Sequence, residues 1–196
     1  MEIRVTDLCK AFGQRVIFNG MSAAFADGER AVVMGASGCG KTTLLRILMG
    51  FERPDSGEVT GVPERVSAVF QEDRLLENFS AASNVAFAAG KGTTERHIIR
   101  HLEEVGLDGS AKQSVSEMSG GMRRRVAIVR AMLARKGLLL LDEPLKGLDD
   151  HRRDLVAKYI KRQSEGVTTI IVTHDIDEAA MLGAALAHIE WQVISV

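Results

Sequence analysis

The most specific chemical pattern in the sequence is a glycine-rich loop, Gly35-Ala36-Ser37-Gly38-Cys39-Gly40-Lys41-Thr42, which matches G-x-x-x-x-G-K-[ST] in full. Glycines at these positions let backbone N–H groups curl around phosphate oxygens without a Cβ in the way. In such a loop Lys41 reaches the β- and γ-phosphates of a nucleotide, and the Thr42 hydroxyl ligates Mg²⁺. A chance match in a chain of this length is on the order of 1%. The loop therefore predicts a phosphate-binding site, in which we expect Cys39 to serve packing.

Two acidic residues, Asp142 and Glu143, follow an apolar run at Leu138–Leu141. An acid that ends a central strand lies at the edge where α/β sheets bind their ligands. We expect Asp142 to hold Mg²⁺ through water, and Glu143 to be the general base for a water that attacks the γ-phosphate. Acids often end strands, so this pattern is weak alone and strong only in combination with the phosphate loop.

A third pattern, Ser119-Gly120-Gly121, stands at the start of an amphipathic segment. Ser119 is a good helix N-cap. Two glycines in the first helical turn cost roughly 1 kcal/mol each relative to alanine, so a structural cap alone does not explain them. Exposed N–H groups at a helix start bind anions, and we interpret the run as a second phosphate contact.

In this order the motifs resemble those of the nucleotide-binding subunit of an ATP-binding cassette (ABC) transporter, over essentially all 196 residues. The resemblance implies an ATPase with ATP and Mg²⁺ as cofactors, and Thr42, Gln71 and Asp142 as metal-binding residues. Ser119, Gly120 and Gly121 match the signature motif of that family. The loop residues that the resemblance assigns to the nucleotide are Gly35, Ser37, Gly38, Cys39, Gly40, Lys41, Thr42 and Thr43.

The resemblance also implies functional roles for four single residues. Phe12 matches the aromatic position that stacks on adenine, and Asp149 lies in the loop after the catalytic glutamate. Gln71 matches the glutamine that contacts Mg²⁺ and the attacking water and senses the membrane partner. His174 matches the switch histidine that contacts the γ-phosphate. The implied catalytic residues are therefore Glu143, His174 and Gln71, although each weak residue alone would more often be structural.

The resemblance also implies partners. Two copies would form a head-to-tail homodimer with ATP between them, docked on transmembrane permease subunits that receive solute from a binding protein. The chain would then be cytoplasmic and peripheral on the inner face of the cell membrane. The segments Gln71–Leu76 and Asn84–Phe87 resemble the importer subgroup that serves nitrate, sulfonate or taurine systems.

The sequence departs from the family pattern in three places. Met118 and Met122 replace the usual leucine and glutamine of the signature motif, so hydrogen bonds of the usual glutamine are in doubt. The stretch Gly57–Gln71 is shorter than usual. The chain ends soon after a strand-like tail, Ala184–Val196, from which we expect no C-terminal regulatory domain.

The elements that must position these residues follow from hydrophobic periodicity. Buried parallel strands are expected at 30–34, 65–70, 138–141 and 168–172. Helices are expected at 42–49, 94–105, 119–136, 150–164 and 175–182. The more polar segments at 2–28 and 57–60 suggest a small antiparallel layer, and about 75–135 a helical insertion. We therefore expect an α/β fold, a P-loop NTPase core with a parallel sheet, in one domain over 1–196.

Composition narrows the class of protein. The chain has 25 Lys plus Arg and 26 Asp plus Glu, which gives a net charge of −1. This balance lacks the excess of positive charge that is typical of nucleic-acid-binding proteins. We expect the basic run Arg123-Arg124-Arg125 to be a solvated helix face. Two cysteines make neither a disulfide framework nor a four-ligand metal site, and with no secretory signal they favour a reduced compartment. No apolar run approaches the roughly 18–20 residues that span a bilayer.

Three alternatives stay open at this point. A soluble ABC-type ATPase that acts on nucleic acid or ribosomes would carry the same motifs, usually with two cassettes or coiled-coil insertions. A small-metabolite kinase would share the phosphate loop, but nothing in it requires Ser119-Gly120-Gly121 or His174. Export is as compatible with the ATPase motifs as import is.

Overall fold

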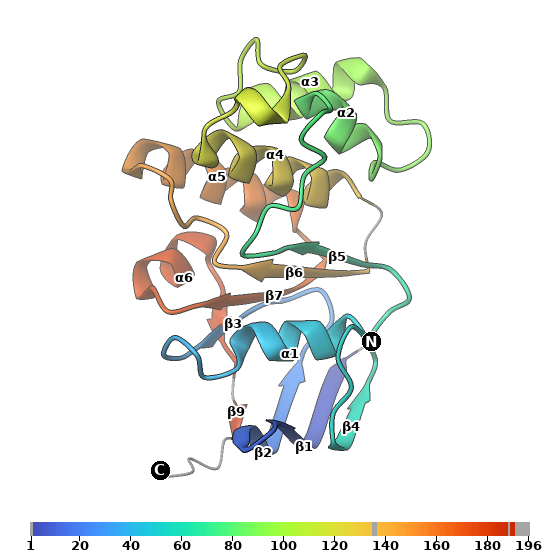
Figure 1. The fold of residues 1–196 in the computed structure, drawn as a ribbon, viewed down its shortest axis with the longest axis vertical. Helices are drawn as coiled ribbons and strands as arrows, with labels where there is room; N and C mark the ends of the chain where they lie inside the picture. Colours follow the sequence, from blue (N-terminus) through green and yellow to red (C-terminus); the bar gives the residue numbers. More distant parts are fainter. Residues whose placement is uncertain (1, 135–136, 188, 191–196) are drawn as a thin grey trace.

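The computed structural model describes residues 2–134, 137–187 and 189–190. Figure 1 shows two sheets with α1 between them, and further helices stacked beyond the larger sheet. The elements are β1 (Ile3–Phe12), β2 (Arg15–Phe25), β3 (Arg30–Met34), α1 (Lys41–Leu48), β4 (Ser56–Thr60), β5 (Val66–Val69), α2 (Ala81–Ala86), α3 (Glu95–Glu104), a 3₁₀ turn η1 (Val115–Glu117), α4 (Gly120–Leu133), β6 (Leu138–Asp142), α5 (Asp150–Gln163), β7 (Thr168–Thr173), α6 (Ile176–Leu182), β8 (Ala185–Leu186) and β9 (Ile189–Glu190).

The larger sheet is parallel and buried on both faces. Its strand order is β5-β6-β7-β3-β8. Side chains alternate across a strand, so the leucines of β6 divide between two cores. Leu138 and Leu140 pack with α1 and the smaller sheet, whereas Leu139 and Leu141 pack with α4, α5 and the helices beyond them. The α/β prediction and its short apolar strands are confirmed.

The smaller sheet is antiparallel, as expected, with strand order β4-β1-β2-β9. β1 and β2 form a hairpin in which Ile3 pairs with Phe25 and Phe12 with Arg15. The inward side chains of the hairpin, among them Ile3 and Phe25, pack with the apolar face of α1. The hairpin thereby holds Phe12, at the end of β1, close to the start of α1.

The helices α2, α3 and α4 and the turn η1 occupy the chain between β5 and β6. α4 ends at Leu133 and not at Lys136 as expected, because Ala134 turns extended and pairs in an isolated bridge with Ala89. Residues 135–136 lie outside the described part. The predicted strand-like tail is described as far as β8 and β9; His188 and residues 191–196 of it lie outside the description.

The polar segments of interest follow the carboxyl ends of neighbouring parallel strands. The phosphate loop follows β3, Asp142 ends β6 and Glu143 follows it, and His174 follows β7. Gln71 comes two residues after β5. In open α/β sheets this edge is where ligands bind, and the strand order explains why residues far apart in sequence converge there.

Candidate functional site

The phosphate loop is shaped by glycine conformations that other residues rarely adopt. Gly38 and Gly40 have φ of 81° and 104°. A Cβ on Gly40 would lie 2.5 Å from Ile17 Cγ2 and 2.9 Å from the Phe18 ring, so the hairpin of the smaller sheet presses on the loop. Cys39 Sγ would lie 2.6 Å from a Cβ on Gly35, which supports the packing role expected for this cysteine.

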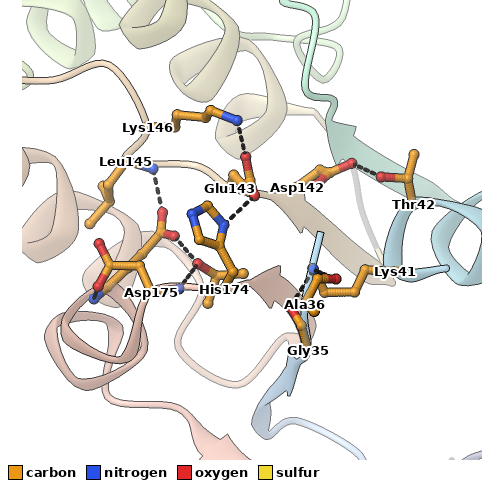
Figure 2. Close-up of polar contacts among 12 residues, drawn as sticks. Gly35, Ala36, Lys41, Thr42, Asp142, Glu143, Leu145, Lys146, His174 and Asp175 are labelled. Atoms are coloured by element: carbon orange, nitrogen blue, oxygen red, sulfur yellow. Dashed lines mark hydrogen bonds and ion pairs between the residues drawn. The ribbon is translucent and has the colours of Figure 1, made fainter. Parts of the chain in front are cut away.

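Lys41 and Thr42 begin α1 and make different contacts. Lys41 Nζ donates to the carbonyl oxygens of Gly35 at 2.6 Å and Ala36 at 3.0 Å, so its ammonium group lies within the curve of the loop (Figure 2). The Thr42 hydroxyl donates to Asp142 Oδ2 at 2.8 Å. Burial raises the pKa of Asp142, and the Thr42 hydrogen bond opposes that effect.

Thr42 and Asp142 offer hydroxyl and carboxylate oxygens side by side, the hard ligands that Mg²⁺ prefers. Within the described residues no group of three or more His, Cys, Asp or Glu side chains could hold a metal by itself. A magnesium ion is commonly bound by one or two protein groups together with substrate phosphates, and the Thr42 hydroxyl and the Asp142 carboxylate supply two such groups. The donor set is therefore compatible with a metal that arrives with a nucleotide.

Glu143 is held in a strained backbone conformation. Its φ of 46° lies in the left-handed region, which costs a residue with a Cβ roughly 1–2 kcal/mol. Its Oε1 lies 2.6 Å from His174 Nδ1, and its Oε2 accepts from Lys146 Nζ at 2.5 Å (Figure 2). Burial acts to raise the pKa of Glu143, but the hydrogen bonds from Lys146 and His174 outweigh it, and the pKa is below its ordinary value.

The loop that carries His174 is fixed by a buried acid, Glu178, on α6. Glu178 is 3% exposed, and its carboxylate accepts from the backbone N–H of Leu145 at 2.6 Å and from the Thr173 hydroxyl. Burial raises the pKa of this carboxyl group. The contact ties the segment after Glu143 to the segment that carries His174, so these two residues keep their relative placement.

One cavity of about 430 Å³ gathers most of the predicted site residues. A smaller adjoining cavity of about 200 Å³ is lined by both Glu143 and His174. The predicted residues that line the larger cavity are Phe12, Ser37, Gly38, Gly40, Lys41, Thr42, Thr43, Gln71, Asp142 and Glu143. Phe12 is 48% exposed, and Lys10 Nζ lies over its ring, 4.9 Å from the ring centroid.

The signature residues and Asp149 do not line either of these cavities. Ser119 caps α4 by accepting from the backbone N–H of Met122 at 3.3 Å, which confirms the predicted cap. A Cβ on Gly121 would lie 3.6 Å from the Gly147 carbonyl oxygen, so the start of α4 adjoins the loop that leads to Asp149. These residues therefore form a second cluster in the same chain.

The expectation that Arg123-Arg124-Arg125 is a solvated helix face is wrong. Arg124 is 5% exposed and Arg125 is 7% exposed. Both guanidinium groups are buried because they donate to backbone carbonyls of neighbouring loops, such as Pro144 for Arg124 and Val105 for Arg125. Helical periodicity cannot reveal these acceptors, which are 18 to 54 residues away for Arg124.

Three further side chains of the larger cavity were not predicted, those of Ile17, Lys146 and Arg15. Lys146 pairs with Glu143, and its i,i+3 spacing from that acid was the available signal. Arg15 donates from Nη2 to the carbonyl oxygen of Gly38 at 2.9 Å and so braces the phosphate loop from the hairpin. Among the helices of the described chain, none is long and apolar enough to cross a bilayer.

Comparison with known proteins places this site in context. A family model described as "ABC transporter" matches residues 18–146. The aliphatic sulfonates import ATP-binding protein SsuB 2 of Burkholderia cenocepacia is 42% identical over 186 residues, covering 89% of this chain and 68% of that protein. SsuB 1 of Pseudomonas syringae is 39% identical, covering 93% of this chain and 77% of that protein.

Solved structures agree with the family match. The dimeric structure of MJ0796, a bacterial ABC transporter cassette, superposes with a TM-score of 0.81 at 25% identity, covering 91% of this chain and 90% of that one. A post-hydrolysis state of MJ0796 bound to ADP and Pi superposes with a TM-score of 0.79 at 26% identity, again covering 91% and 90% of the two chains.

Proposed function

Because this chain belongs to the ABC transporter family, we propose that it is the ATP-hydrolysing subunit that energises the import of an aliphatic sulfonate. The observation that carries this proposal is the pairing of one cavity, lined by a complete phosphate loop and by Asp142 and Glu143, with relatives about 40% identical that are sulfonate import ATP-binding proteins. The chain is an ATPase, and the expected membership of the nitrate, sulfonate and taurine subgroup agrees with these relatives.

ATP enters the larger cavity with its phosphates on the loop between β3 and α1. The loop N–H groups and the positive end of α1 bind the phosphate oxygens. Lys41 Nζ gives up its hydrogen bonds to the loop carbonyls and donates instead to the β- and γ-phosphates. Phe12 stacks on adenine at the cavity edge. Thr42, Asp142 and Gln71 would hold Mg²⁺, which would neutralise charge on the phosphate oxygens.

Glu143 takes the proton of the attacking water. Its lowered pKa keeps the carboxylate ionised at neutral pH, which is the form that accepts a proton. His174 holds Oε1 through Nδ1, and the same side chain would contact the γ-phosphate. The left-handed backbone of Glu143 aims the carboxylate at the cavity, and the Glu178 contacts hold the His174 segment against it.

The second cluster completes the site of another copy. Ser119, Gly120 and Gly121 lie outside the cavity of their own chain, yet the exposed N–H groups of an α4 start would suit a γ-phosphate. A head-to-tail dimer places this helix start opposite the phosphate loop of a second copy, with Asp149 near the contact. The dimeric MJ0796 cassette supports dimerisation. Loss of the bridging γ-phosphate then opens the dimer.

The dimer works on the inner face of the membrane, where it docks on permease subunits. These subunits receive the solute from a solute-binding protein. The test is reconstitution of this chain with its permease in proteoliposomes, where ATP hydrolysis is measured with the binding protein and an alkanesulfonate. Hydrolysis should rise with the sulfonate and not with nitrate. A response to nitrate alone would assign a different solute, and absence of Mg²⁺-dependent hydrolysis by the purified chain would remove the proposal altogether.

A further inference from the structure

The guanidinium group of Arg124 is saturated by acceptors from two separate loops. An arginine has five N–H donors in a planar fork, and all five find an oxygen here. Nε donates to Pro144 O at 3.2 Å; Nη1 donates to Phe70 O and, at 3.2 Å, to Asp73 Oδ1. Nη2 donates to Asp142 O and, at 2.7 Å, to Glu143 O.

Three of these acceptors are consecutive carbonyls, those of Asp142, Glu143 and Pro144. Carbonyls along a strand point alternately to opposite sides, so three in a row reach one group only where the chain turns. The turn is the left-handed conformation of Glu143, whose φ is 46°. Arg124 therefore binds the backbone in the conformation that directs the Glu143 side chain into the cavity.

The other two acceptors bracket Gln71. Phe70 O belongs to the peptide bond that Phe70 makes with Gln71, and Asp73 is two residues further along. Asp73 also supplies a negative charge, at 3.2 Å, for a cation that is 5% exposed. One buried side chain thus holds the segments of Gln71 and Glu143 at a fixed distance from each other.

We propose that Arg124 is a positioning residue for ATP hydrolysis, which sets the Gln71 segment against the Glu143 segment across the cavity. The inference rests on the proposed roles of these two residues. Arg124 lies on α4, which Ser119 caps and Gly120 begins, so it also links the signature to the backbone of Glu143. Lysine, with three donors on a tetrahedral nitrogen, cannot serve acceptors in this planar arrangement.

The first test compares Arg124→Met and Arg124→Lys with the wild-type chain. Displacement of a catalytic group by about 1 Å can slow a reaction ~100-fold, so we expect kcat to fall at least about tenfold in both variants. The Kd for ATP and the number of ATP molecules bound per chain should stay unchanged, because the phosphate loop is untouched. Arg30→Met is the control, since Arg30 begins β3 at the end away from the loop and donates to Lys161 O.

A merely structural role of Arg124 gives a different result. In that case kcat and the number of ATP molecules bound per chain fall together as part of the protein unfolds, and the proposal is overturned. A double-mutant cycle provides the second test. Arg124→Met should lower the residual hydrolysis of Glu143→Gln by less than about twofold, because the placement of Gln71 against the Glu143 carboxylate no longer matters once that carboxylate is gone. A further tenfold loss in that background overturns the proposal.

These outcomes separate the inference from the proposed function. Should the wild-type chain lack Mg²⁺-dependent hydrolysis, the proposed function fails before any variant is compared. Should the wild-type chain hydrolyse ATP while Arg124→Met, folded to the same extent, keeps its kcat, the inference about Arg124 alone fails.

Discussion

Lys146 Nζ lies 2.5 Å from Glu143 Oε2, so a cation occupies one oxygen of the carboxylate that we assign as general base. Lys146 is 54% exposed in its side chain and follows Glu143 by three residues, on the loop that leads to α5. The ammonium group of Lys146 favours the ionised form of the Glu143 carboxyl group at the cavity wall. A water that attacks a phosphate must therefore share this carboxylate with the lysine.

Lys146→Met should move the acidic limb of the pH–rate profile to higher pH. The Lys146 hydrogen bond and charge lower the pKa of Glu143, so their removal lets burial raise it. The base is lost as Glu143 becomes protonated, and that loss then begins at a higher pH. The measurement is kcat/KM for ATP against pH at saturating Mg²⁺, with Lys146→Arg as the variant that keeps the limb in place. An acidic limb identical in Lys146→Met and wild type would contradict the assignment.

Glu143→Gln should keep ATP binding and lose hydrolysis. The amide retains the size of the side chain but accepts no proton from water, and we expect a fall in kcat of at least about 100-fold. With ATP and Mg²⁺ the variant should elute as a dimer in size-exclusion chromatography, because the γ-phosphate stays in place. Turnover near that of the wild type would remove Glu143 from the role of base.

Gly40→Ala should weaken both folding and nucleotide binding. At φ 104° the new Cβ would be strained and would lie 2.5 Å from Ile17 Cγ2, which we expect to cost about 2 kcal/mol of unfolding free energy. Denaturant unfolding and ATP titration measure the two effects. Gly50→Ala is the matched control, since Gly50 has φ 72° with nothing within 4 Å of its Cβ position, and ATP affinity should not change there.

Mixing two inactive variants tests the head-to-tail dimer. Lys41→Ala disables the phosphate loop, and Ser119→Arg blocks the signature with a bulky side chain. In a head-to-tail heterodimer one site carries both lesions and the other carries neither, so hydrolysis should return to as much as about a quarter of wild type after random exchange. Activity that stays at the level of the separate variants would mean that both motifs serve one chain.

The sequence predicted the parts of the site whose signals are local. The phosphate loop, its flanking strand and helix, and the acids that end β6 are each contained within a few residues, and the structure places them as expected. Ser119 is an N-cap for the same reason. Such patterns predict backbone geometry directly, because a glycine, an N-cap or an apolar run determines the conformation of the residues next to it in the sequence.

Contacts between distant segments were not predictable in this way. Arg124 donates to carbonyls 18 and 54 residues away, and any side chain can meet a backbone carbonyl, so its own neighbourhood carries no sign of these partners. The run Arg123-Arg124-Arg125 led instead to the prediction of a solvated helix face. The Lys146–Glu143 pair could have been found, since its partners are three residues apart, but the turn that joins them follows from the left-handed Glu143.

The two-sided packing of β6 has a mechanical consequence. Leu138 and Leu140 bind the strand to the body that holds α1 and the smaller sheet, whereas Leu139 and Leu141 face the helical body. All four leucines are fully buried, so neither group of helices can shift over the strand without breaking close apolar contacts. A substitution that enlarges or shortens a leucine on either face would therefore be transmitted to Asp142, at the end of β6, and to Glu143, which follows it.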